Sequence, residues 1–178
     1  MIDGITKEEA SRLFEDYSPL TYRIALMLTK SPALADDVVQ ETFIRIFEKY
    51  HLYDRSKPLQ PWVCKVAMNT ARNLMRKHKW QKLTGWFPAR ETVGSAEQAH
   101  LQNVTSRELW SVIEKLPLKS KEIVILRYYA DMPLQDIADT LGIPLGTCKS
   151  RLHTAVRQLQ KESKQLSFHP LVEDGGVQ

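Results

Sequence analysis

Apolar residues recur at intervals of three and four along most of this sequence, and this spacing restricts its fold more than any other feature. In the segment 34–50, for example, Val38, Phe43, Ile46 and Phe47 are spaced so that they share one face of an α-helix. The chain contains only 7 glycines in 178 residues, and its β-branched residues do not gather in alternating runs. The sequence therefore predicts an all-α protein.

Capping residues and prolines divide this pattern into separate helices. Thr6 and Glu9 have the spacing of a capping box, which predicts a helix over about 6–17. The pairs Ser18-Pro19 and Ser31-Pro32 each predict a new helix start, because proline is favoured at the first helical position. The remaining helices are predicted near 34–50, 61–83, 105–116, 118–130, 133–141 and 145–165.

The helices fall into two groups, separated by a segment of weak periodicity. This segment, 85–103, contains two glycines and a proline and is typical of a linker. We expect two small helical domains joined by this linker. Their predicted bounds are 1–84 for the first domain, 104–166 for the second, and 167–178 for a frayed tail.

Positive charge is concentrated in two separate stretches. Residues 55–90 hold nine Lys or Arg, residues 140–161 hold four, and neither stretch contains an acid. The acids lie elsewhere, notably in 8–16, 36–48 and 131–139. This distribution predicts two contact points with a polyanion such as nucleic acid. Two solvated helix faces are the alternative, although such faces usually mix both signs.

Several classes of protein are disfavoured by what the sequence lacks. No apolar stretch approaches the roughly 20 residues of a membrane span, and the acidic N-terminal segment does not resemble a signal peptide. We therefore expect a cytoplasmic protein. Cys64 and Cys148 are far apart and are expected to be small buried residues. The histidines show no metal-ligand spacing with them, so no metal and no cofactor is predicted.

Residues 133–165 have the pattern of a helix-turn-helix. A short helix would place Leu134 and Ile137 inward, and Gly142 would permit a tight turn before the next helix. The first turns of that second helix would meet base edges in the major groove, where large apolar side chains do not fit and carboxylates are repelled. The small, hydroxyl or basic residues there are Gly146, Thr147, Lys149, Ser150 and His153, while Cys148, Leu152, Val156 and Leu159 form the packing stripe. An ordinary helical hairpin with a basic outer face is the alternative.

Two longer segments resemble one family. The string ADDVVQETFIRIFEKY (35–50), followed by PWVCKVAMNTARNLMRKHK (61–79), resembles conserved region 2 of bacterial extracytoplasmic-function (ECF) sigma factors. The segment LPLKSKEIVILRYYADMPLQDIADTLGIPLGTCKSRLHTAVRQL (116–159) resembles their region 4. Two motif blocks in the right order are more specific than either block alone.

The resemblance implies roles for individual residues of the first domain. Docking on the clamp helices of the polymerase β′ subunit is implied for Asp37, Gln40, Glu41 and Phe43. Contacts to the −10 element, including capture of a flipped base, are implied for Tyr53, Lys65, Asn69, Arg72, Asn73 and Arg76. Trp62 matches a family tryptophan and is expected to lie in the core, with base stacking as the alternative.

In the second domain, the resemblance implies contacts to the −35 element. The residues are Arg127, Pro144, Gly146, Lys149, Ser150, His153 and Thr154. Many family members carry Arg where this chain has Thr154, so its −35 preference is expected to differ from theirs.

Together these features predict a sigma factor without a catalytic site of its own. It would bind core RNA polymerase through β′ and the β flap, recognise −10 and −35 promoter elements, and be restrained by an anti-sigma factor. A helix-turn-helix regulator that works without polymerase is one alternative, but it leaves 36–79 unexplained. A magnesium-dependent nucleotide pyrophosphohydrolase using Asp36, Asp37, Glu41 and Glu48 is the other, and it requires acids converging from more than one helix.

Overall fold

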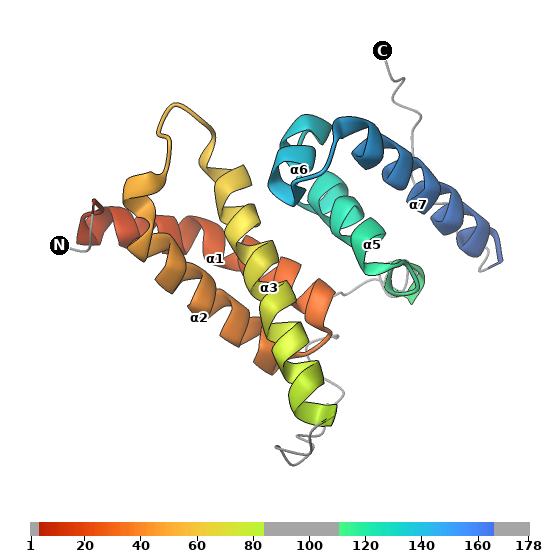
Figure 1. Cartoon of the computed structure of the whole chain (residues 1–178), viewed down its shortest axis with the longest axis horizontal. Coiled ribbons are helices and arrows are strands. Elements are labelled where there is room, and N and C mark those ends of the chain that lie inside the picture. Colours follow the sequence, from red (N-terminus) through yellow and green to blue (C-terminus); the bar gives the residue numbers. More distant parts are fainter. Residues whose placement is uncertain (1–3, 84–110, 166–178) are drawn as a thin grey trace.

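The computed structural model describes residues 4–83 and 111–165, and no β-strand occurs within these ranges. The helices form two groups that lie side by side (Figure 1). The expected linker, the start of the helix expected near 105 and the expected tail lie outside the described residues.

The first helix, α1, spans Lys7–Thr29 and is longer than the sequence predicts. Its capping box is confirmed: Thr6 accepts from the backbone N–H of Glu9, and the Glu9 carboxylate accepts from the N–H of Thr6. The predicted new start at Ser18-Pro19 is wrong, because Pro19 lies inside a continuous helix. The buried side chains, Leu13, Thr21, Ile24, Ala25 and Leu28, keep one helical spacing across the proline. Burial of this single face outweighs the local cost of a proline in a helix interior.

The rest of the first group follows the predicted order. Helix α2, Pro32–Glu48, begins with Ser31 as N-cap, whose hydroxyl accepts from the N–H of Leu34. A 3-10 turn, η1, covers Tyr50–Leu52, and the long helix α3 covers Leu59–Leu83. Helices α1, α2 and α3 pack against one another, which turns the outer sides of α2 and α3 toward solvent.

The second group contains α5 (Leu118–Val124), α6 (Leu134–Leu141) and α7 (Leu145–Gln165). The predicted continuous helix over 118–130 is interrupted by a π-helical turn, η3, over Ile125–Tyr129, where the N–H of Ala130 bonds to the carbonyl of Ile125. Such wide turns occur mostly within longer helices and often near functional residues. Gly142 ends α6 with a φ of 65°, so the expected glycine turn is confirmed.

The two groups share one apolar core. A single buried cluster joins Cys64, Met68 and Ala71 of α3 to residues of the second group, among them Ile123 and Ile137. The sequence predicts a buried stripe on α3 made of Trp62, Val63, Val66, Ala67, Thr70, Leu74 and Met75. Of these, Val63, Ala67 and Thr70 are buried and the other four are half-buried. Met68 and Ala71 are also buried but are not predicted, because a distant part of the chain covers them.

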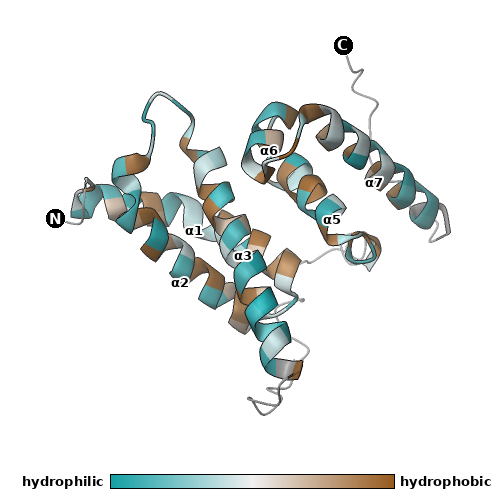
Figure 2. Ribbon diagram, in the orientation of Figure 1, coloured by the Kyte–Doolittle hydropathy of each residue, from teal (hydrophilic) through white to brown (hydrophobic). Residues whose placement is uncertain are grey.

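Two general expectations also bear on the described residues. Both cysteines are free and buried, as predicted. Across 4–83 and 111–165, no helix combines the length and apolar composition that a membrane span requires. Figure 2 shows hydrophilic residues over most of the visible side of the C-terminal half of α3.

Candidate polymerase and promoter surfaces

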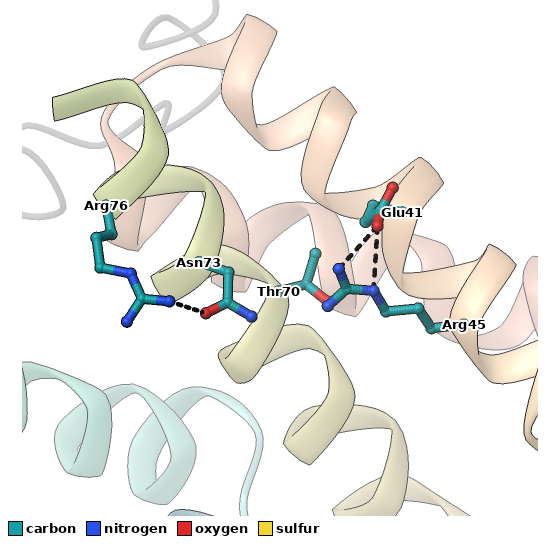
Figure 3. Close-up of polar contacts among 5 residues, drawn as sticks. All are labelled: Glu41, Arg45, Thr70, Asn73 and Arg76. Carbon is teal, nitrogen blue, oxygen red and sulfur yellow. Dashed lines mark hydrogen bonds and ion pairs between the residues drawn. The ribbon is translucent and has the colours of Figure 1, made fainter. Parts of the chain in front are cut away.

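The outer face of α2 presents acidic and amide side chains to solvent. Asp37 and Gln40 are exposed, and Glu41 is half-buried. Their spacing of three and four places them on neighbouring turns of one helix face. The Glu41 carboxylate is held by Arg45, with an Nη2–Oε1 distance of 2.8 Å, and Arg45 Nη1 also donates to Thr70 Oγ1 on α3 at 3.3 Å (Figure 3). These contacts hold the Glu41–Arg45 pair against α3.

Phe43 requires a correction. The resemblance groups it with the docking residues, but its side chain is only 2% exposed. Its ring packs edge-on against Phe14 at a centroid distance of 4.8 Å and against Phe47 at 5.9 Å. Phe43 therefore supports the docking face from beneath and does not reach a partner in this conformation.

A hollow next to this face was not predicted from the sequence. It has a volume of about 490 Å³ and lies between α1 and α2, with Phe14, Pro19, Val39 and Gln40 among its lining residues. The Phe14 side chain is 43% exposed although it is large and apolar. The signal in the sequence is that Leu13 and Phe14 are adjacent large apolar residues. Neighbouring residues of a helix point about 100° apart, so when Leu13 enters the core, Phe14 is turned toward the surface.

The outer face of α3 carries most of the residues predicted to contact the −10 element. Lys65, Asn69, Asn73 and Arg76 are exposed. Arg76 Nη2 donates to Asn73 Oδ1 at 3.1 Å, which orients the Asn73 amide (Figure 3). The face therefore combines cations with amides that can both donate and accept hydrogen bonds.

Arg72 differs from its neighbours on this face. It is half-buried, and its guanidinium forms two hydrogen bonds with Glu122 on α5, both at 2.6 Å. The Glu122 side chain is 3% exposed and that of Arg72 is 34% exposed. The pKa of Arg72 is raised, chiefly because its guanidinium donates hydrogen bonds to the Glu122 carboxylate. Arg72 also donates to Asn69 Oδ1 at 3.4 Å.

The loop before α3 places three aromatic rings together. Tyr53 lies 5.2 Å from Trp62 and 5.9 Å from Tyr50, measured between ring centroids. The Tyr53 hydroxyl donates to the Lys57 carbonyl, and burial raises the pKa of Tyr53. Trp62 is half-buried: it packs against the buried core cluster of the first group and also contacts the Tyr53 ring. A partly exposed aromatic cluster beside a cationic helix is a suitable surface for stacking an unpaired base.

The beginning of α7 is open to solvent, as the helix-turn-helix pattern predicts. The predicted contact residues that are exposed here are Pro144, Gly146, Lys149, Ser150, His153 and Thr154. Cys148 is buried beneath them, together with Ala155, which the predicted stripe did not include. A Cβ added at Gly146 would meet no atom within 4 Å. Internal packing therefore does not require glycine there, whereas close approach of a ligand backbone would.

Arg127 lies apart from this exposed group. It is half-buried in the π-helical turn, and its Nη1 donates to the Met132 carbonyl at 3.1 Å. The contact ties the turn to the segment before α6. A contact between Arg127 and the −35 element stays a prediction.

No group of three or more His, Cys, Asp or Glu side chains in the described ranges is arranged to hold a metal ion. The pyrophosphohydrolase alternative needs such a group, with acids converging from facing helices.

Family comparisons agree with the two helical groups. The model of the family Sigma-70 region 2 matches residues 13–81, and that of Sigma-70 region 4 matches residues 106–159. These two regions, in this order on one chain, define a bacterial sigma factor, the class of protein that directs promoter-specific transcription initiation.

Relatives narrow the class further. The chain is 29% identical over 173 residues to ECF RNA polymerase sigma factor SigL of Mycobacterium tuberculosis, covering 93% of this chain and 96% of the relative. It is also 29% identical to ECF RNA polymerase sigma factor SigM of Bacillus subtilis, covering 83% and 91%. The chain belongs to the ECF group of the sigma-70 family.

Solved structures show the same fold. The sigma factor RpoE of Bartonella quintana, solved with the anti-sigma factor NepR, matches with a TM-score of 0.71 at 22% identity, covering 86% of this chain and 96% of that one. CnrH, solved with the cytosolic domain of CnrY, matches with a TM-score of 0.67 at 21% identity, covering 91% and 90%.

Proposed function

We propose that this chain is a non-catalytic initiation subunit that works in the cytoplasm. It docks on core RNA polymerase through the exposed face of α2, opens and holds the −10 element with α3 and the Tyr53 loop, and reads the −35 element as duplex with the start of α7. In this proposal the polymerase-docking and −10-binding domain covers 1–84, the −35-binding domain covers 104–166, and a linker over 85–103 connects them.

One observation carries this proposal. A single chain presents an acidic and amide face on α2 and two separate basic faces, on α3 and on α7. Acids would be repelled by phosphate, so the α2 face is suited to a protein partner, while the basic faces are suited to nucleic acid. The exposed Phe14 ring, which lines the hollow together with Gln40, gives that protein partner an apolar group to contact.

Transcription in vitro with purified core polymerase tests the division of roles. We expect Lys149→Ala to weaken transcription from promoters that depend on a −35 element about tenfold, because one cationic base or phosphate contact contributes roughly 1–3 kcal/mol. Binding to core polymerase should be unchanged. Lys161→Ala is the matched control, since it removes the same charge from an exposed site about 18 Å further along α7.

Equal loss of polymerase binding and transcription in Lys149→Ala would contradict this division. The alternative regulator is separated by a gel shift with duplex promoter DNA. The proposal expects poor binding by the free protein and strong binding once core polymerase is added. Tight, sequence-specific binding by the protein alone would favour the alternative.

Two structural neighbours were solved with anti-sigma factors or with the cytosolic domain of a partner. We extend the proposal to a restraining protein of that kind for this chain. Purification of the protein from its own cells tests this extension. Recovery only as free chain or as polymerase complex, under conditions where its promoters are silent, would contradict it.

A further inference from the structure

The contact between Arg72 and Glu122 joins a residue proposed to bind the −10 element to the opposite half of the molecule. We propose that Glu122 is a built-in competitor of promoter DNA: it occupies the Arg72 guanidinium in the free protein and releases it when the two halves separate. This inference rests on the proposed function, because it assumes that α3 binds DNA.

The geometry of the pair supports competition with phosphate. Arg72 donates from Nε and Nη2 to the two oxygens of one carboxylate, each at 2.6 Å. An arginine fork binds a carboxylate and a phosphate in the same two-pronged manner, so one partner excludes the other. Glu122 is almost fully buried, and a carboxylate in such a place needs a partner for its charge.

Further contacts show that the pair belongs to a closed interface between the halves. The Gln60 amide donates to the Ala130 carbonyl, and the Thr140 hydroxyl donates to the Pro61 carbonyl at 3.4 Å. A further contact comes from α1, where Arg23 Nη1 donates to the Tyr129 hydroxyl at 2.8 Å. The apolar cluster of α3 and the second group adds to these polar contacts.

The closed form cannot engage both promoter elements in the proposed way. Elements centred near −10 and −35 are about 25 steps apart, or roughly 85 Å at 3.4 Å a step. Here α3 packs directly on α6, the helix that precedes the recognition helix α7. The 27 residues between Leu83 and Ser111 can span up to about 90–97 Å when extended, so the covalent connection permits the opening.

The polymerase surface is not restricted in the same way. Asp37 and Gln40 are exposed in the closed form, and so are Lys65, Asn69, Asn73 and Arg76. Core polymerase can therefore dock first on α2, while the −10 face lacks one of its cations. The expected consequence is weak binding of DNA by the free chain.

Binding of a labelled single-stranded oligonucleotide of mixed sequence to the full chain tests this proposal. Glu122→Gln removes the competing charge, and we expect about tenfold tighter binding. Because Arg72 becomes available as one more phosphate contact, the slope of log K against log salt should steepen by about 0.7. Glu48→Gln is the matched control, since it changes the net charge equally at an exposed site on α2.

Energy transfer between dyes measures the opening itself. Dyes placed at Glu8→Cys, an exposed position near the start of α1, and at Lys161→Cys report the separation of the halves, and the two native cysteines are buried. We expect Glu122→Gln to raise the low-transfer population about tenfold, and core polymerase to move the wild-type protein to low transfer. The proposal would be overturned if Glu122→Gln and Glu48→Gln had the same affinity for the oligonucleotide, the same salt slope and the same low-transfer population.

Gln60→Ala provides a second variant in case Glu122→Gln destabilises the second group, which circular dichroism would reveal. It leaves the ion pair intact and removes the amide contact to Ala130. It should raise the low-transfer population and, because opening frees Arg72, tighten binding of the oligonucleotide. More opening without tighter binding would overturn the proposal. With core polymerase, Glu122→Gln should transcribe within twofold of wild type. If neither the wild type nor Glu122→Gln transcribes with core polymerase, the proposed function is rejected. The binding and energy-transfer measurements on the free chain test the competition between Glu122 and DNA independently of transcription.

Discussion

Phe43→Leu distinguishes a residue that supports the docking face from one that contacts the partner. The Phe43 ring is 2% exposed and packs against Phe14 and Phe47. Each ring–ring contact contributes about 0.5–1.5 kcal/mol beyond area burial, so losing both costs about 2 kcal/mol. The two helical groups share one core, and for a cooperative unit of 150–250 residues each kcal/mol lowers Tm by about 2–4 °C. We therefore expect a decrease in Tm of about 4–8 °C.

Thermal unfolding followed by circular dichroism measures this decrease, and fluorescence anisotropy measures affinity for core polymerase well below Tm. For Phe43→Leu, the affinity should stay within about twofold of wild type. Gln40→Ala is the counterpart, because Gln40 is exposed at the rim of the hollow. It should leave Tm nearly unchanged and weaken polymerase binding. A Phe43→Leu protein with normal Tm and weak polymerase binding would refute the reasoning from burial.

Three further predictions concern strand opening, the turn before α7 and the buried thiol. Asn69→Ala should reduce permanganate reactivity of the −10 region while leaving closed-complex formation intact, and unchanged reactivity would argue against base capture by Asn69. Gly142→Ala should lower the free energy of unfolding by about 1–2 kcal/mol, measured by urea denaturation, because its φ of 65° disfavours any Cβ although no atom lies within 4 Å. Burial raises the pKa of the Cys64 thiol to about 12 from 9.0. Since the unfolded thiol ionises first, its contribution to stability is complete below pH 9 and is lost as pH rises toward 12. Cys64→Ala should flatten the decline of stability over that window, and an identical decline would show that other groups cause it.

Local patterns predict helix ends well in this chain. The capping box of Thr6 and Glu9, the N-cap Ser31 and the left-handed Gly142 all form as the sequence indicates. Each depends on hydrogen bonds or backbone preferences within about four residues, so neighbouring residues contain all the necessary information. The exposed start of α7 was predictable for the same reason, because the periodicity of one helix separates its buried stripe from its polar face.

The errors have a different origin. Pro19 is a strong local signal for a break, but the buried face of α1 continues across it. Phe43 belongs to a motif that the resemblance assigns to a surface, and only the position of Phe14 on another helix shows that its ring is enclosed. Met68 and Ala71 of α3, which the predicted stripe lacks, are buried together with Cys64 against the second helical group.

The sequence by itself therefore determined the helical class, most helix boundaries, the two basic stretches and the family. Tertiary structure alone decided which of the predicted contact residues are available. Arg72 meets Glu122 across 50 positions of sequence, and Arg23 meets Tyr129 across 106. Contacts over such separations arise from the packing of whole helices, which no local spacing specifies, and for that reason the closed interface became apparent only in three dimensions.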